Sequence, residues 1–202
     1  MRPLKRLPNS KKYSTYQSYK ADLLARYGSY CAYCEKKDGD LDVEHVEPKS
    51  KSGKITDWDN LLLACPTCNR DFKKAFNPDR KGYVFPDHNE SYKVFHYRSN
   101  GTVGAVTAAA VATRKLCGLN RPGAMSNRTD AFERAKGMRN EVLAGTRTPA
   151  DVIPWARAMG HWSVWMSVFR NEAAVIALLL DPANFPGIRA AFLHPVNPPI
   201  VR

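Results

Sequence analysis

The sequence predicts an α+β fold: a small unit of two strands and a helix, with one helix before it and a mostly helical half after it. Two Cys-x-x-Cys pairs bracket the strand segment, at residues 31–34 and 65–68. Between them, short apolar runs favour strands, whereas from about Thr107 onward apolar residues recur at helical spacing. We therefore divide the chain into a basic N-terminal segment and helix (1–30), a core with a following hairpin (31–106) and a helical region (107–202).

The composition indicates a globular protein with an anionic partner. The chain has 202 residues, of which 44% are hydrophobic, enough for a sizeable core. Lys and Arg number 31 against 19 Asp and Glu, a net charge of +12, which favours DNA, RNA or an anionic membrane surface. The longest apolar run, "AAVIALLL", is too short to cross a bilayer, and the first residues lack the apolar core of a signal peptide. We expect a cytoplasmic protein without a membrane span.

The N-terminal segment carries one predicted helix. Apolar side chains at helical spacing run from Thr15 to Tyr27, and Gly28 supplies a stop. The first dozen residues, rich in Lys and Arg, are expected to be mobile.

The central segment alternates strands and loops. "LDVEHV" and "NLLLA" are predicted strands, "PKSKSGKITDWD" is the loop between them, and "CPTCNRDFKKAF" opens a helix with Pro66 near its first turn. Further on, Asn100-Gly101 lies between alternating residues and predicts a hairpin with a type I′ turn.

The remaining chain is predicted to be helical, with Gly, Pro and Asn in short loops. An extended Pro-rich tail is expected at 194–202. The helical segments are 108–119, 124–145, 149–160 and 161–181.

Four of the five cysteines have the spacing of a structural zinc site. Two residues between thiolates let both sulfurs of a tight turn reach one Zn²⁺ ion, and two such turns complete a closed tetrahedral site. The alternatives are two independent redox motifs, which usually lie in βαβ units not evident here, or accidental pairs. Cys117 is expected to pack in the core as a small apolar residue. The predicted zinc ligands are Cys31, Cys34, Cys65 and Cys68.

Between and just after these pairs lie polar residues suited to general-base and metal chemistry. The imidazole of His45 is largely neutral at pH 7 and can take a proton from water. Glu44 and Asn69 offer oxygen ligands to Mg²⁺ or Mn²⁺. Because neighbouring residues on a strand point to opposite faces, we expect the strand to bend or end at Glu44 and His45.

The stretches "CAYC", "DVEHVEPKS" and "WDNLLLACPTCNRDFKK" together resemble the HNH endonucleases, whose fold is the ββα-metal unit. The resemblance covers about 45 residues and implies a metal-dependent nuclease. It also implies that Asn60 holds the loop and the backbone of His45 in place. Asn69 stands where many members of the family have His.

Basic residues near these motifs are candidates for substrate phosphate contact. Arg70 and Lys73 lie on the helix after the second cysteine pair, and Lys49 lies in the loop after the first strand. For each of them, an ordinary solvated surface charge is the alternative.

A narrower resemblance comes from "FHYRSNGTV", "RKLCGLNRPGAMSNR" and the helical half, which are similar to PtuB-type HNH proteins. These belong to Septu and retron-linked anti-phage systems, so the resemblance implies a defence role beside an ABC-type, PtuA-like ATPase. Two other classes stay open: a non-catalytic zinc module that binds nucleic acid, and a toxin-like RNase that cleaves RNA or tRNA.

Overall fold

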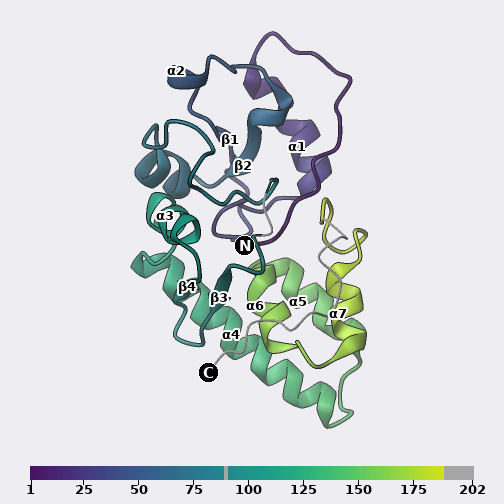
Figure 1. Ribbon diagram of the computed structural model, residues 1–202. Helices are drawn as coiled ribbons and strands as arrows, with labels where there is room; N and C mark the ends of the chain where they lie inside the picture. Colours follow the sequence, from purple (N-terminus) through teal and green to yellow (C-terminus); the bar gives the residue numbers. More distant parts are fainter. Residues whose placement is uncertain (89–90, 189–202) are drawn as a thin grey trace.

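A computed structural model describes residues 1–88 and 91–188 and confirms the mixed α+β fold. Figure 1 shows one half of the molecule built around β1, β2 and α1, and a second half made of α4, α5, α6 and α7. The hairpin of β3 and β4 lies between the halves, beside α3. The predicted tail at 194–202 lies outside the described residues.

The N-terminal helix forms as predicted but the residues before it are packed. A 3₁₀ turn, η1 (Tyr16–Tyr19), leads into α1 (Lys20–Tyr27), which ends at Gly28 with a φ of 72°. The expected mobility of the first dozen residues is wrong for the first four: Leu4 is 1% exposed, and its amide donates to the Pro86 carbonyl at 2.7 Å. Burial of this apolar side chain offsets the entropy lost on ordering the segment.

The central unit is an antiparallel strand pair followed by a helix. β1 (Asp42–His45) pairs with β2 (Leu61–Ala64), with His45 opposite Leu61. The expected loop between them contains two short helical turns, α2 (Lys49–Ser52) and η2 (Trp58–Asn60). The helix after β2, η3 (Thr67–Lys73), is a π-helix.

The second hairpin forms where predicted, with a different turn. β3 (Phe95–Tyr97) pairs with β4 (Val103–Ala105). The type I′ expectation is wrong, because φ is positive at Gly101 but not at Asn100. Instead the Gly101 amide donates to Arg98, and Arg98 pairs with Thr102, the pattern of a three-residue loop that ends in a left-handed residue. Glycine is also required sterically, since a Cβ at 101 would collide with the carbonyl of Met125.

The C-terminal half consists of helices, but the predicted helix at 161–181 is two. The chain leaves helical geometry between Phe169 and Glu172, where the Glu172 amide donates to the Phe169 carbonyl at 2.9 Å. Another 3₁₀ turn, η4 (Pro149–Asp151), precedes α5. The helices are α3 (Ala108–Leu116), α4 (Pro122–Leu143), α5 (Val152–Met159), α6 (Trp162–Val168) and α7 (Ala173–Leu180).

Buried apolar side chains form two clusters that meet along α4. One surrounds the cysteine pairs and takes Ala131 and Phe132 from α4; the other fills the helical half and takes Ala135 and Met138. Trp162 belongs to the second cluster and is 2% exposed. The domain boundaries at 30/31 and 106/107 stay predictions.

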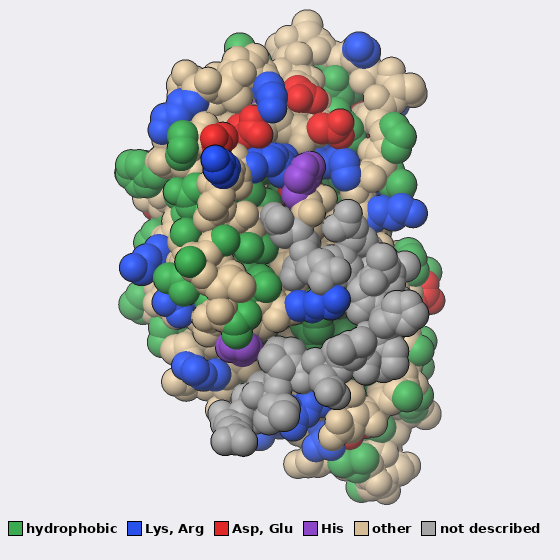
Figure 2. Space-filling model, viewed as in Figure 1, with side chains coloured by type: hydrophobic (Ala, Val, Ile, Leu, Met, Phe, Trp, Pro, Cys, Tyr) green, Lys and Arg blue, Asp and Glu red, His purple; other side chains and the backbone are tan. Residues whose placement is uncertain are grey.

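Charge is spread over the visible face of the molecule. Figure 2 shows Lys and Arg side chains along its whole length, while most of the visible acidic side chains gather over the half that holds β1 and β2. Charge alone therefore does not locate a site on this face. Within residues 1–88 and 91–188, none of the helices has the length and apolar character that a bilayer span needs.

Candidate metal centre and active site

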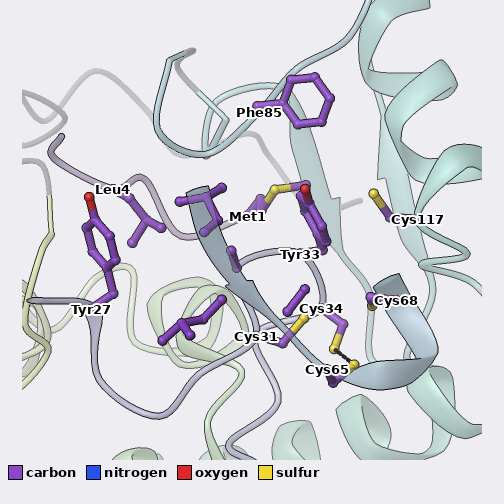
Figure 3. Packing of buried hydrophobic residues seen from close by; sticks show 14 of the residues in the cluster. Met1, Leu4, Tyr27, Cys31, Tyr33, Cys34, Cys65, Cys68, Phe85 and Cys117 are labelled. Atoms are coloured by element: carbon purple, nitrogen blue, oxygen red, sulfur yellow. Dashed lines mark hydrogen bonds between the residues drawn. The ribbon is translucent and has the colours of Figure 1, made fainter. Parts of the chain in front are cut away.

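The four predicted cysteine ligands converge on one point. Their sulfurs all lie within 4.8 Å of one another, and the Sγ atoms of Cys34 and Cys65 are 3.8 Å apart. That separation equals the edge, about 3.8 Å, of a tetrahedron with Zn–S bonds of about 2.3 Å. It is far longer than a disulfide bond of about 2.05 Å, and the cysteines are free thiols. Figure 3 shows the group together. The four-thiol set therefore fits a structural zinc ion.

The first cysteine turn is joined to both halves of the protein. Glu35, with a φ of 66°, follows Cys34 and donates its amide to the Cys31 carbonyl at 2.9 Å. Its buried carboxylate accepts hydrogen bonds from the amide and hydroxyl of Ser163 on α6, both at 2.7 Å. Folding of the metal site and docking of the helical half are thereby coupled.

Arg121 places a positive charge against the thiols. Its guanidinium lies 3.4 Å from Cys68 Sγ and 3.9 Å from Cys65 Sγ, and stacks 5.5 Å from the ring centroid of Phe72. A zinc ion with four thiolates carries a net charge of about −2, which a nearby cation stabilises.

We predict that Arg121→Met weakens zinc binding by about 10- to 100-fold, the usual effect of losing a hydrogen-bond partner of a metal ligand. Competition with a chromophoric chelator measures the affinity. Arg134→Met, which removes an arginine stacked 4.0 Å from the Trp155 ring, is the matched control. Equal zinc affinity in the two variants would contradict a role for Arg121 at the centre.

Cys117 does not join the cluster. It is fully buried, lies apart from the other four in Figure 3, and burial raises the pKa of its thiol. The prediction that it packs in the core is confirmed.

A pocket of about 310 Å³ lies beside β1, between this strand, the segment 48–50 and the helix η3. Most of the predicted polar site residues line it, together with Tyr16 and Lys74. Asn60 and Lys73 lie outside its lining. The predicted residues in the lining are Glu44, His45, Lys49, Asn69 and Arg70.

His45 ends β1 and is held by its ring. Its Nε2 lies 2.8 Å from the Ile55 carbonyl, which can only accept, so Nε2 carries the proton and Nδ1 keeps its lone pair. The ring packs edge-on against Tyr16, with centroids 4.6 Å apart. Burial is the main cause that lowers the pKa of His45, and Lys49 and Lys73 lower it further against the opposing Ile55 hydrogen bond. The imidazole is therefore a neutral base at pH 7.

Asn60 supports the chain just after His45. Its side-chain oxygen accepts from the Glu47 amide at 2.8 Å, and its amide group donates to the Glu47 carbonyl at 2.8 Å. Its own carbonyl accepts from the Val46 amide. These bonds fix the exit of β1, as a positioning residue would.

Glu44, which lines the pocket, and Lys73, which does not, form a buried ion pair. The Lys73 ammonium lies 2.5 Å from Glu44 Oε1 and donates to the His45 carbonyl at 2.8 Å, while Tyr33 also donates to Oε1. Burial raises the pKa of Glu44, against the effect of Lys73. Both contacts use the same oxygen, which leaves the second carboxylate oxygen outside the ion pair.

Asn69 and Arg70 both donate hydrogen bonds to Asp42, which is not among the predicted site residues. Asp42 accepts from the Asn69 side-chain amide at 3.0 Å and from Arg70 Nε at 2.8 Å, and Arg70 Nη2 makes a second bond to it. The Asn69 side-chain oxygen is left as an acceptor at the pocket. Arg70 contacts Asp42 here, so a substrate phosphate would have to share its guanidinium.

The structure places Lys73 away from any surface where a phosphate could bind, since it is 0% exposed. Its neighbour Lys74 lines the pocket and is exposed. The cause is the π-helix: the Lys74 amide donates to Asn69, five residues earlier, which shifts the face that each side chain occupies relative to an α-helix.

Other residues at the site were missed in the sequence. The alternation "DVEH" places Asp42 on the same strand face as Glu44, a signal that the pattern did contain. The approach of Tyr16 to His45 and of Tyr33 to Glu44 has no local signal, because these pairs are brought together by tertiary packing.

Two antiparallel strands, a following helix and four convergent thiols form a ββα unit with a four-cysteine metal-binding cluster. In agreement, residues 31–74 match the family model described as HNH endonuclease. The matched segment supports nuclease activity, a divalent metal and a nucleic-acid substrate for this region. No curated protein matches the chain.

Proposed function

We propose that the protein is a metal-dependent HNH endonuclease that hydrolyses phosphodiester bonds, with its active site in the pocket beside β1. One observation carries the proposal: His45, fixed in the tautomer of a base, lines the same pocket as Glu44 and Asn69. A zinc module without catalysis would need the cysteines but not this arrangement.

Each residue has a role that follows from its contacts. His45 takes the proton of the attacking water at Nδ1, because Nε2 is bound to Ile55. Asn60 positions the backbone after His45. Lys73 holds Glu44 and the His45 carbonyl together, so we assign it a positioning role in place of phosphate contact.

The donor set fits a hard cation. Glu44 and Asn69 both line the pocket and offer oxygens, and a bound Mg²⁺ or Mn²⁺ would stabilise charge on the phosphate and the leaving oxygen. Because Lys73 offsets the charge of Glu44, two such ligands alone bind Mg²⁺ weakly, and we expect substrate phosphate to complete the site. Lys49 and Lys74 line the pocket and are the candidates for phosphate contact, with Arg70 beside them.

We predict that cleavage requires added Mg²⁺ or Mn²⁺ even when zinc is fully bound, because thiolates and oxygen ligands select different metals. Protein with verified zinc content is incubated with plasmid, single-stranded DNA and tRNA across a Mg²⁺ titration. Asn69→Ala should raise the Mg²⁺ concentration for half-maximal rate about 10-fold or more, whereas Asn140→Ala, at an exposed site on α4, should not. Cleavage by zinc-loaded protein free of other metals would refute the assignment of separate structural and catalytic metals.

We further propose a defence role, in which the helical half binds an ABC-type ATPase that restrains or positions the nuclease. The resemblance to PtuB-type proteins supports this, as does a pocket of about 520 Å³ near α5 and α7, lined by apolar residues with Lys37 and Arg157. Most of the second apolar cluster lies in the helical half, and Tyr30 joins it from outside.

Co-purification with the product of a neighbouring ATPase gene tests the partner proposal. Arg157→Glu should weaken the complex, whereas Lys115→Glu on α3 should not. If the wild-type proteins form no complex at micromolar concentration, with or without ATP, the partner proposal is wrong and the nuclease proposal stands by itself.

A further inference from the structure

A second pocket, of about 450 Å³, lies next to the one that holds His45. It is bounded by the N-terminal segment 9–13 and by the loop 53–58, with Tyr19 and Trp58 at its base. None of the predicted site residues lines it.

The two pockets are linked through the contact between Ile55 and His45. Ile55, which lines the second pocket, supplies the carbonyl that holds His45 Nε2. The turn η1 separates them: Tyr16 at one end lines the first pocket, and Tyr19 at the other end lines the second. A strand whose phosphate sits beside His45 therefore has the second pocket as its neighbour.

Basic side chains surround the second pocket. Lys11, Lys12 and Lys54 line it and are exposed. Lys11 pairs with Asp22 and Lys54 pairs with Glu47, but both lysine side chains are about half exposed, at 60% and 47%, so these surface pairs are weak and can be exchanged for phosphate. Asp57 lines the same pocket and uses its carboxylate to cap the Asp59 amide.

An aromatic ring completes the pocket. Tyr13 is half-buried and is held edge-on by Tyr19, with centroids 4.7 Å apart. A partly exposed ring in T-shaped contact with a buried one, and set among lysines, is an arrangement that can stack an unpaired base while the lysines hold the adjacent backbone.

We propose that this second pocket binds an unpaired base of the strand that is cleaved, stacked on Tyr13, with the neighbouring phosphate held by Lys12. The substrate is then a nucleic acid with single-stranded character, DNA or RNA, because a paired base keeps both of its faces inside the duplex stack. This inference rests on the proposed nuclease function and extends it to the class of substrate.

Binding measured without cleavage tests the pocket. In a His45→Ala background, fluorescence anisotropy gives the Kd for a labelled single strand, as DNA and as RNA, and for a DNA duplex of the same sequence. Tyr13→Ala should raise the single-strand Kd by about 5- to 100-fold, the effect of losing one stacked base, and leave the duplex Kd within about twofold. Tyr13→Phe, which keeps the ring, should bind like the parent. Lys12→Ala should weaken binding and reduce its salt dependence, whereas Lys115→Ala should change neither.

An unchanged single-strand Kd in Tyr13→Ala, or an equal loss for single strand and duplex, would overturn the inference. Thermal unfolding of each variant controls for the packing of Tyr13 on Tyr19. Because the readout is binding, it is independent of catalysis. If the wild-type protein cleaves no substrate but Tyr13→Ala still weakens single-strand binding, the nuclease proposal is wrong and the proposal of base binding in the second pocket stands.

Discussion

Replacing His45 with alanine should reduce cleavage by about 10²- to 10⁴-fold, the contribution expected of a positioned general base, while fold and zinc content should stay intact. The imidazole contacts Tyr16 and the Ile55 carbonyl, and it does not belong to the four-cysteine site that would hold zinc. Cleavage rate, zinc stoichiometry and circular dichroism are measured on the same preparation. His96→Ala, a half-buried histidine on β3, is the matched control. Full activity in metal-loaded His45→Ala protein would sink the nuclease assignment.

The same residue sets an expected pH profile. A base must be neutral, and burial lowers the pKa of His45 below its ordinary value of about 6.5, with Lys49 and Lys73 acting in the same direction. The rate should therefore stay constant from pH 8 to 7 and fall as the pH drops through this lowered pKa. Lys49→Gln removes one neighbouring charge and should move the acid limb to higher pH, a shift that a role in substrate binding alone would not produce.

The zinc site and the strand pair could be predicted because their signals are local. Cysteine spacing specifies which thiols can share an ion, and the geometry of a strand requires β1 to end where Glu44 and His45 must both face one pocket. β1 does end at His45, and both residues line that pocket.

Other features cannot be predicted from one sequence, either because two backbone geometries suit the same residues or because distant segments meet. The π-helical hydrogen bond from Lys74 to Asn69 decides which lysine reaches the pocket, and nothing in "CNRDFKK" distinguishes it from an α-helix. Similarly, Leu4 joins the buried apolar cluster, and its amide donates to the carbonyl of Pro86, more than 80 positions away. The second pocket combines two segments that are separate in the chain, so its basic and aromatic residues look unrelated in sequence.

Cys34→Ser or Cys65→Ser should abolish zinc binding and the folded state together. A four-thiolate zinc site contributes about 10–16 kcal/mol, as much as or more than the whole stability of about 5–15 kcal/mol that a typical domain has. The cysteines are buried in the same cluster as Leu61 and Leu63 of β2, and Glu35 ties their turn to Ser163, so the loss should spread through both halves.

Native mass spectrometry and thermal unfolding measure the effect, and Cys117→Ala is the matched control. Cys117 is as deeply buried as the ligands but is not one of the four convergent thiols, so its variant should keep one zinc per chain and lose about 1 kcal/mol of stability for the missing sulfur. If instead a Cys34 or Cys65 variant stayed folded and zinc-loaded but lost cleavage, the thiols would belong to the catalytic machinery, and the division of labour between the zinc site and the pocket beside His45 would have to be abandoned.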